Sequence, residues 1–385
     1  MTKLEQYQSV MGRINWVLFL IAVATLPFPQ VFSRYALVAW IVAWVLELRW
    51  CKCPINPLRH KEIIPVLLFG LWYVWRALSG LWSPDHRAWS FMMERYMTFG
   101  LLVPVALWGV NDRYDWRMAG KVWVISCAVA AVFYAILLLA HYDIENLKHR
   151  LFLCSAEIIG AVVALQVWHK RPQVWIPLVV VMLSTIPLTG SRQSVITLAA
   201  VITLVFIYAL PQKHRWLYGL GIMLVGAAVG CIILFTHPRM KGVIADGLTV
   251  EQITKHEPRV GIWSIALKEP EFSFWKGLGG GQSVNYLEKQ YNKFYMKYYK
   301  DHHYHAHNQY LEEFMELGVF GLIYFIVLWL SILMCTKGIG RRTAVFFVTI
   351  YGLNMFTDCM WGKFDGIALW AIVMVYLILQ SRDVK

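Results

Sequence analysis

The chain is built largely from apolar runs of about 20 residues, each separated from the next by a short polar break. An α-helix of that length crosses the hydrocarbon core of a bilayer. Of the 385 residues, 58% are hydrophobic and only 15% are charged, which is too apolar for a soluble domain of this size. Because lipid offers no hydrogen bonds to the backbone, such runs can span only as helices. The sequence therefore predicts an all-α polytopic membrane protein.

Hydropathy divides the chain into about twelve spanning helices and one long polar loop. The predicted helices lie near 14–33, 35–50, 63–81, 91–110, 121–140, 151–168, 174–189, 192–210, 216–236, 309–334, 343–360 and 364–380. The expected organisation is residues 1–236 with the first nine helices, residues 237–308 as a loop with short helices, and residues 309–385 with the last three helices.

The placement of Lys and Arg predicts the orientation of these helices. With both termini on the cytoplasmic side, 18 of the 36 basic residues fall in the inner segments. The short outer connections carry few, and long loops do not follow this rule. The net charge of +13 is therefore read as topological rather than as a sign of nucleic-acid binding, and the long loop is expected on the outer side.

Two arginines stand where a polar side chain could meet a substrate. Arg192 ends the sequence Thr-Gly-Ser-Arg in the tight outer turn between the seventh and eighth predicted helices. Arg259 follows Pro258, which is expected to begin a short helix inside the loop. Guanidinium groups bind phosphate oxygens bidentately, so both residues are candidates for anion binding. The alternatives are an interfacial Arg192 that extends toward water and a solvated loop side chain at Arg259.

Four histidines occur within six residues at the end of the loop: His302, His303, His305 and His307. A metal site is one interpretation. However, no HExxH pattern accompanies them, and none of the seven cysteines lies in the loop, so a zinc site and a disulfide framework are not expected. His307 and Asn308 begin the tenth predicted helix, where the positive end of the helix dipole favours a neutral imidazole that can act as a base. A histidine that only occupies the interface is the alternative.

Two further features of the loop are compatible with substrate binding. The glycines of the segment 277–281 would let the backbone approach a ligand closely, although a plain turn explains them as well. Lys289, Lys293, Lys297 and Lys300 recur at helical spacing among tyrosines. This pattern predicts one basic, aromatic helix on the membrane surface that attracts phosphorylated lipids, or that serves only as an anchor.

The order of these motifs resembles the O-antigen ligase/polymerase family of bacterial envelope glycosyltransferases. The resemblance runs from about residue 185 to residue 325 and rests on Thr-Gly-Ser-Arg192, Arg259, Gly277-Leu278-Gly279, His305-Ala306-His307-Asn308 and Glu316-Leu317-Gly318. It implies a GT-C-like, inverting and metal-independent transferase without a cofactor, in the bacterial inner membrane with its active site facing the periplasm. The implied donor is a glycan on undecaprenyl diphosphate, and the acceptor of the ligase members is lipid A-core.

The resemblance also implies roles for individual residues. Arg192 and Arg259 match the family arginines that hold the donor diphosphate, and His307 matches the catalytic histidine. Asp358 matches an acidic position near the outer end of the penultimate helix. The residues implied as supporting the site are His305, Asn308, Glu316 and Asp358, and those implied as an acceptor or lipid surface are Lys289, Lys293 and Lys297. No residue is assigned to a metal.

The chemistry of glycosyl transfer explains these residue types. Two guanidinium groups can stabilise the charge of a leaving diphosphate in place of a metal, and a histidine can take the proton of the attacking hydroxyl. A polymerase that adds repeat units to another lipid-linked glycan would use the same residues. A transporter of lipid-linked sugars would instead place charges midway along several helices and break helices in pairs, whereas the polar candidates here collect at the outer ends.

Overall fold

The computed structural model describes residues 3–48, 61–109, 114–209, 257–268, 270–294, 296–301 and 304–382. Within these ranges every regular element is a helix. The described residues contain an isolated β-bridge between Ser273 and Gly277 but no β-strand. The predicted all-α class is therefore confirmed. The ninth predicted span, 216–236, lies outside the described residues.

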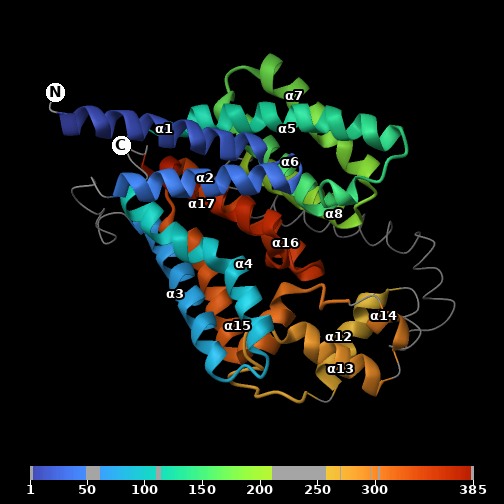
Figure 1. Cartoon of the computed structure of the whole chain (residues 1–385). Coiled ribbons are helices and arrows are strands. Elements are labelled where there is room, and N and C mark those ends of the chain that lie inside the picture. Colours follow the sequence, from blue (N-terminus) through green and yellow to red (C-terminus); the bar gives the residue numbers. More distant parts are fainter. Residues whose placement is uncertain are drawn as a thin grey trace.

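Eleven long helices form the body of the described protein (Figure 1). They are α1 (Lys3–Thr25), α2 (Gln30–Leu48), α3 (Ile64–Leu78), α4 (His86–Pro104), α5 (Trp116–Leu139), α6 (Arg150–Val167), α7 (Pro172–Thr189), α8 (Arg192–Ala209), α15 (Gln309–Cys335), α16 (Gly338–Thr357) and α17 (Phe364–Arg382). Each corresponds to one of the predicted spans. Most bounds differ by a few residues, whereas α1 begins eleven residues before the predicted span 14–33.

Seven of the described helical segments are long and apolar enough to cross a membrane, and α1 and α8 add the shorter apolar stretches Val10–Thr25 and Arg192–Tyr208. Helix α4 is less apolar because it carries Glu94 and Arg95. The chain is thus a helical membrane protein with several spans. The full number of twelve stays a prediction.

Helix α17 forms the centre of the bundle (Figure 1). It is buried almost throughout, and it packs against α2, α4, α5, α6 and α16. Its apolar character on all sides fits this position, since a helix that is hydrophobic all round is a buried one. Aromatic rings fill the space beside it, with Phe69 and Phe99 lying 4.2 Å and 4.6 Å from the ring of Trp370.

Three short helices gather beside α15: α12 (Pro258–Lys268), α13 (Ser283–Lys293) and α14 (Lys297–Asp301) (Figure 1). We call this side of the bundle the loop end. The helices share a small core that includes Ile262, Leu287 and Tyr291. The prediction of one continuous Lys and Tyr helix was wrong, because α13 ends at Lys293 and the chain turns before α14 begins. Buried tyrosines of α13 form this core instead of facing lipid.

Helix α15 is kinked at Gly318, and the glycine-rich segment 277–281 packs onto the kink. Gly318 has φ 68° and ψ −168°, a conformation open essentially only to glycine. The interruption leaves the carbonyl of Glu316 to accept a hydrogen bond of 2.9 Å from the backbone N–H of Gly279. A Cβ on Gly277 would lie 2.4 Å from the carbonyl carbon of Glu316. The glycines therefore let the backbone approach α15, and they are explained without a ligand.

Candidate active site

Asp358, which follows the last residue of α16, faces three histidines at the loop end. Its Oδ1 atom lies 3.5 Å from Nδ1 of His307 and 3.8 Å from Nε2 of His305. Its Oδ2 atom lies 3.7 Å from Nε2 of His149, the residue before α6. The histidine side chains keep 21% to 33% of their surface exposed, whereas the carboxylate is largely buried. We call these four residues the histidine cluster.

The start of α15 fixes the geometry of the two loop histidines. Asn308 caps the helix, and its side-chain oxygen accepts a hydrogen bond of 3.0 Å from the backbone N–H of Leu311. His307 has a positive φ of 46°, which is uncommon for a residue with a side chain. Its backbone N–H donates to Nδ1 of His305 at 3.1 Å. Asn308 therefore acts as a cap, and His305 is held as an acceptor by the backbone of His307.

Burial and neighbouring charges shift the pKa values of three members of the histidine cluster. Burial, followed by the neighbouring His307, lowers the pKa of His305 to about 4. Burial also lowers the pKa of His149, and Lys363 adds to the effect. Burial alone would raise the pKa of Asp358, but the adjacent His307 and the charges of the histidines outweigh it and lower that pKa. The arrangement thus pairs an ionised carboxylate with imidazoles, of which His305 and His149 favour the neutral form.

The same atoms could also hold a cation. One ligand atom each from His305, His307 and Asp358 lies within 4.8 Å of the others. Two imidazoles and a carboxylate are donors that divalent transition metals accept. Nδ1 of His305 accepts the N–H of His307, which leaves Nε2, the atom that faces Asp358, as the nitrogen of His305 that a cation could bind. The geometry is therefore compatible with both proton transfer and metal binding.

Arg192 lies at the start of α8, close to the end of α16 that carries Asp358. The next residue, Gln193, donates from Nε2 to the carbonyl of Leu353 at 2.9 Å. Thr197, one turn further, donates to the side chain of Asn354 at 2.8 Å. Arg192 itself is exposed. The contacts of Gln193 and Thr197 thus place the start of α8 beside the end of α16 that precedes Asp358.

Helix α12, which carries Arg259, contacts the same region through Trp263, one turn further along the helix. The indole N–H of Trp263 donates to the carbonyl of Ala306 at 2.8 Å, and its ring lies 5.5 Å from that of Phe356. The side chain of Arg259 is 39% exposed and lies 4.0 Å from Glu257. The structure thus brings the segments of both arginines to the histidine cluster, while the described contacts do not join their side chains to it.

The predicted lysine surface is dispersed. Lys289 is exposed on α13, and Lys293 forms an ion pair of 2.9 Å with Glu271. The side chain of Lys297 and the residues His302 and His303 lie outside what the structure describes.

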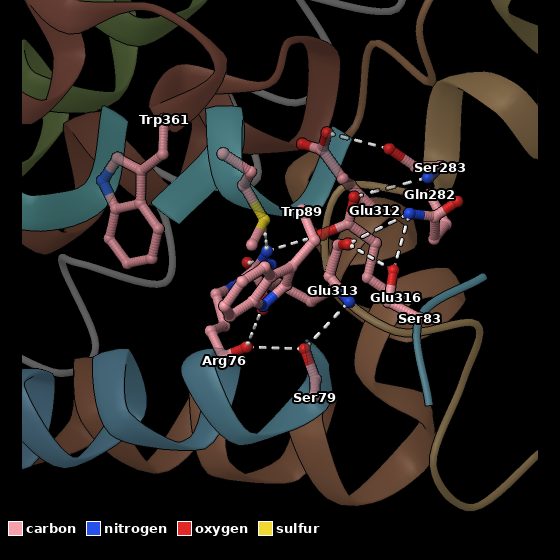
Figure 2. Close-up of polar contacts among 12 residues, drawn as sticks. Arg76, Ser79, Ser83, Trp89, Gln282, Ser283, Glu312, Glu313, Glu316 and Trp361 are labelled. Carbon is pink, nitrogen blue, oxygen red and sulfur yellow. Dashed lines mark hydrogen bonds and ion pairs between the residues drawn. The ribbon is translucent and has the colours of Figure 1, made fainter. Parts of the chain in front are cut away.

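The loop end contains a second charged group, which was not predicted from the sequence. Arg76 in α3 is completely buried and pairs with two glutamates of α15, at 2.7 Å from Glu313 and 2.5 Å from Glu316 (Figure 2). Its guanidinium also lies 4.5 Å from the ring of Trp72 and 5.0 Å from that of Tyr96. The sequence did contain a signal, because an arginine inside the predicted span 63–81 is costly unless it is paired.

This Arg76 network extends to the glycine-rich segment and its neighbours (Figure 2). Glu316 accepts the backbone N–H of Ser283 at 3.4 Å. The side chain of Gln282 donates to Ser83 at 2.7 Å, and the backbone N–H of Gly280 donates to Ser79 at 2.9 Å. Glu316, implied as a supporting residue of the site, therefore fastens the loop to α3 and α15 instead of touching the histidine cluster.

The Arg76 network and the histidine cluster are joined by Gln309. Its side-chain N–H donates to Glu313 at 3.1 Å, and its side-chain oxygen accepts the backbone N–H of Trp361 at 3.0 Å. Trp361 lies three residues after Asp358. The network therefore fixes the turn that carries the carboxylate relative to the helix that carries His307.

The fold and the site define a helical membrane protein with a carboxylate and histidine centre at one end of its bundle. Residues 177–326 match the family model described as O-antigen ligase. This match supports assignment to the O-antigen ligase/polymerase family, whose members act on lipid-linked glycans. The matched region contains Arg192, Arg259, His305 and His307, but neither His149 nor Asp358. No curated protein matches the chain.

Proposed function

We propose that the protein is an O-antigen ligase, which transfers a glycan from undecaprenyl diphosphate to lipid A-core. The observation that carries the proposal is the pair of His307 and Asp358, at 3.5 Å, where segments of the family-matched region meet. A glycosyl transfer needs a base for the acceptor hydroxyl at such a position.

In the proposed reaction His307 takes the proton. With Nδ1 facing Asp358, Nε2 is the nitrogen that can accept the proton of the acceptor hydroxyl as its oxygen attacks the anomeric carbon. Asp358 then stabilises the imidazolium and holds the ring in place. His305 is unsuited to this role, because its Nδ1 is occupied and its pKa of about 4 makes it a weak base.

Arg192 and Arg259 stabilise the leaving group in this proposal. Cleavage of the anomeric C–O bond leaves the undecaprenyl diphosphate with an additional negative charge, and attack from the opposite side inverts the anomeric centre. Bidentate guanidinium contacts stabilise that charge without a metal. The exposure of both side chains fits a role that begins when the donor arrives. We therefore propose a metal-independent reaction without a cofactor.

The proposed setting is the bacterial inner membrane, with about twelve spans and both termini in the cytoplasm. Residues 1–236 and 309–385 then lie in the membrane, and 237–308 form a loop that faces the periplasm. The contacts of α12 and α13 with the ends of α15 and α16 fit a loop that covers the site from this side.

Transport of a lipid-linked sugar is the second candidate, because one observation favours it. Glu157 is buried within α6 and accepts a hydrogen bond of 2.5 Å from Thr185 of α7. An ionisable group inside a span often marks a transport path. A ligase needs no such path, so the two candidates differ in whether purified protein catalyses transfer.

The test is a transfer assay with purified protein, a glycan on undecaprenyl diphosphate, and either lipid A-core or a second lipid-linked repeat unit as the acceptor. The ligase proposal expects product on lipid A-core that persists when a chelator is added. Product on the repeat unit alone would identify a polymerase, and loss of product with the chelator would show that the histidine cluster works through a metal. Absence of product on either acceptor would favour transport.

A further inference from the structure

A cavity of about 630 Å³ opens beside the histidine cluster. It lies between α2, α4, the segment 145–149 and the turn that leads into α17. This volume is typical of a small-molecule site and suits the head group of a glycolipid rather than the whole molecule. His149 lines the cavity and lies 3.7 Å from Asp358, whose other oxygen faces His307. A ligand here would therefore be separated from the proposed base only by these side chains.

Two arginines of the cavity are held in place by aromatic rings. The guanidinium of Arg34 lies 5.3 Å from the ring of Phe364, and that of Arg95 lies 4.8 Å from the ring of Phe91. Arg95 also donates a hydrogen bond to the carbonyl of Gly362. Across the described ranges no carboxylate lies within ion-pair distance of either arginine. Both guanidinium groups are thus positioned in advance and keep donors available for an anion.

The acidic residues of the cavity are largely neutralised by other partners. Asp365 pairs with the buried Lys148 at 2.7 Å. Glu145 lies 3.7 Å from Arg150 and 4.0 Å from Lys363. Glu94 is exposed, so its charge is screened by water. The interior of the cavity therefore favours a negatively charged group.

The rim of the cavity is apolar. Val38 of α2 and Phe91 and Met97 of α4 are exposed by 50%, 62% and 48%. On a helix that crosses a membrane, exposed apolar side chains face lipid chains. A ligand with its anionic head in the cavity could thus extend a hydrocarbon chain between α2 and α4 into the bilayer.

We propose that this cavity binds the phosphorylated head group of the acceptor lipid. The proposal rests on the proposed transfer reaction, which requires two amphiphilic substrates. Arg192 and Arg259, assigned to the donor diphosphate, do not line the cavity. Donor and acceptor then approach Asp358 from two sides, with the acceptor entering past His149 and its hydroxyl meeting His307.

The test measures binding separately from transfer. Full-length protein in lipid nanodiscs is titrated with radiolabelled lipid A-core, with the same lipid after enzymatic removal of its phosphates, and with inorganic phosphate as a competitor. Arg34→Gln and Arg95→Gln should each raise the Kd of the phosphorylated lipid about tenfold, because each removes a charged hydrogen bond. Neither should change the Kd of the dephosphorylated lipid. Arg87→Gln, which removes an exposed arginine of α4 that does not line the cavity, is the matched control.

The outcomes separate this inference from the proposed function. If the wild type binds lipid A-core and the two variants bind it more weakly, the assignment of the cavity as a lipid A-core site is supported even when no transfer occurs. If both variants bind as the wild type does, or if Arg87→Gln weakens binding equally, the cavity is not the acceptor site, whatever the transfer assay shows. Inorganic phosphate should displace lipid A-core but not the dephosphorylated lipid. If it displaces both lipids equally, the cavity does not recognise the lipid phosphate. Arg95→Lys, which keeps the charge, serves as a second variant if Arg95→Gln fails to fold.

Discussion

The two charged groups at the loop end, the Arg76 network and the histidine cluster, are built in opposite ways. Arg76 is completely buried and contacts Glu313 and Glu316 at 2.7 Å and 2.5 Å. In the histidine cluster the distances to Asp358 are 3.5 Å to 3.8 Å, and the imidazoles are partly exposed. The first group has direct, short ion pairs, whereas the second keeps loose contacts and access to solvent.

This difference indicates different tasks. Short ion pairs that are buried away from water are costly to separate, because separation would leave a charge buried without a partner. Loose contacts to an accessible imidazole allow a proton to move and a substrate to enter. The Arg76 network thus acts as a clamp that holds the loop on α15, and the histidine cluster acts as the proposed reactive centre. Each prediction below perturbs one side of this comparison.

The largest effect is expected from Arg76→Met. Loss of the guanidinium would leave Glu313 and Glu316 buried together, which should destabilise the protein by about 3–5 kcal/mol. The measurement is the thermal midpoint of the purified protein in detergent, together with the yield of monodisperse protein. Arg87→Gln, at an exposed position of α4, should change neither. An unchanged midpoint for Arg76→Met would contradict the role of a clamp.

Loss of a proposed diphosphate contact should reduce transfer without reducing stability. Arg192→Gln and Arg259→Gln are each expected to lower kcat by about 10²–10³-fold, the usual effect of removing one donor to a developing anion. Both side chains are exposed, so the thermal midpoints should stay at the wild-type value. Arg171→Gln, at an exposed arginine before α7, is the control. Full activity in either active-site variant would remove that arginine from the mechanism.

A smaller loss of stability is expected from the kink of α15. In Gly318→Ala the new Cβ would lie 2.3 Å from the carbonyl carbon of Trp275, in a backbone conformation with φ 68°. We expect a cost of about 2 kcal/mol, measured as a shift in the thermal midpoint. Gly190→Ala is the matched control, because its φ is 67° and no atom lies within 4 Å of the new Cβ; it should cost about 1 kcal/mol. Equal costs would show that the packing of the loop on α15 adds little.

A further prediction concerns acid. The pKa of His305 is about 4 in the folded protein and 6.5 ordinarily, so the unfolded state binds more protons between these values. Stability should therefore fall as the pH is lowered from 6.5 to about 4. His305→Gln should flatten this part of the curve of thermal midpoint against pH. Parallel curves for the variant and the wild type would mean that His305 does not carry the effect.

Much of the fold followed from the sequence, because helices that face lipid leave a direct pattern in hydropathy. The wrong prediction of one Lys and Tyr helix has a physical cause. The spacing of Lys289, Lys293 and Lys297 is helical, but periodicity does not detect the end of α13 at Lys293. Nor does it show that Tyr291 turns inward.

The candidate site was predicted in part. His307 and Asp358 were candidates from the sequence, and the structure places them 3.5 Å apart, while their roles stay a prediction. His149 and Arg76 were not found, because their partners Asp358 and Glu316 lie more than 200 residues away in the chain. A single sequence shows that a charged residue occupies an apolar run, but not which residue neutralises it.

The most direct test of the central claim is a double-mutant cycle on His307 and Asp358, measured as single-turnover glycan transfer at saturating donor and acceptor. His307→Gln is expected to lower the rate by about 10²–10⁴-fold. Asp358→Asn should also lower it, and the double variant should be no slower than His307→Gln, because Asp358 acts through the imidazole. If the rate reduction in the double variant equals the product of the two single reductions, Asp358 does not act through His307 and the account is contradicted. An unchanged rate in His307→Gln would contradict it as well.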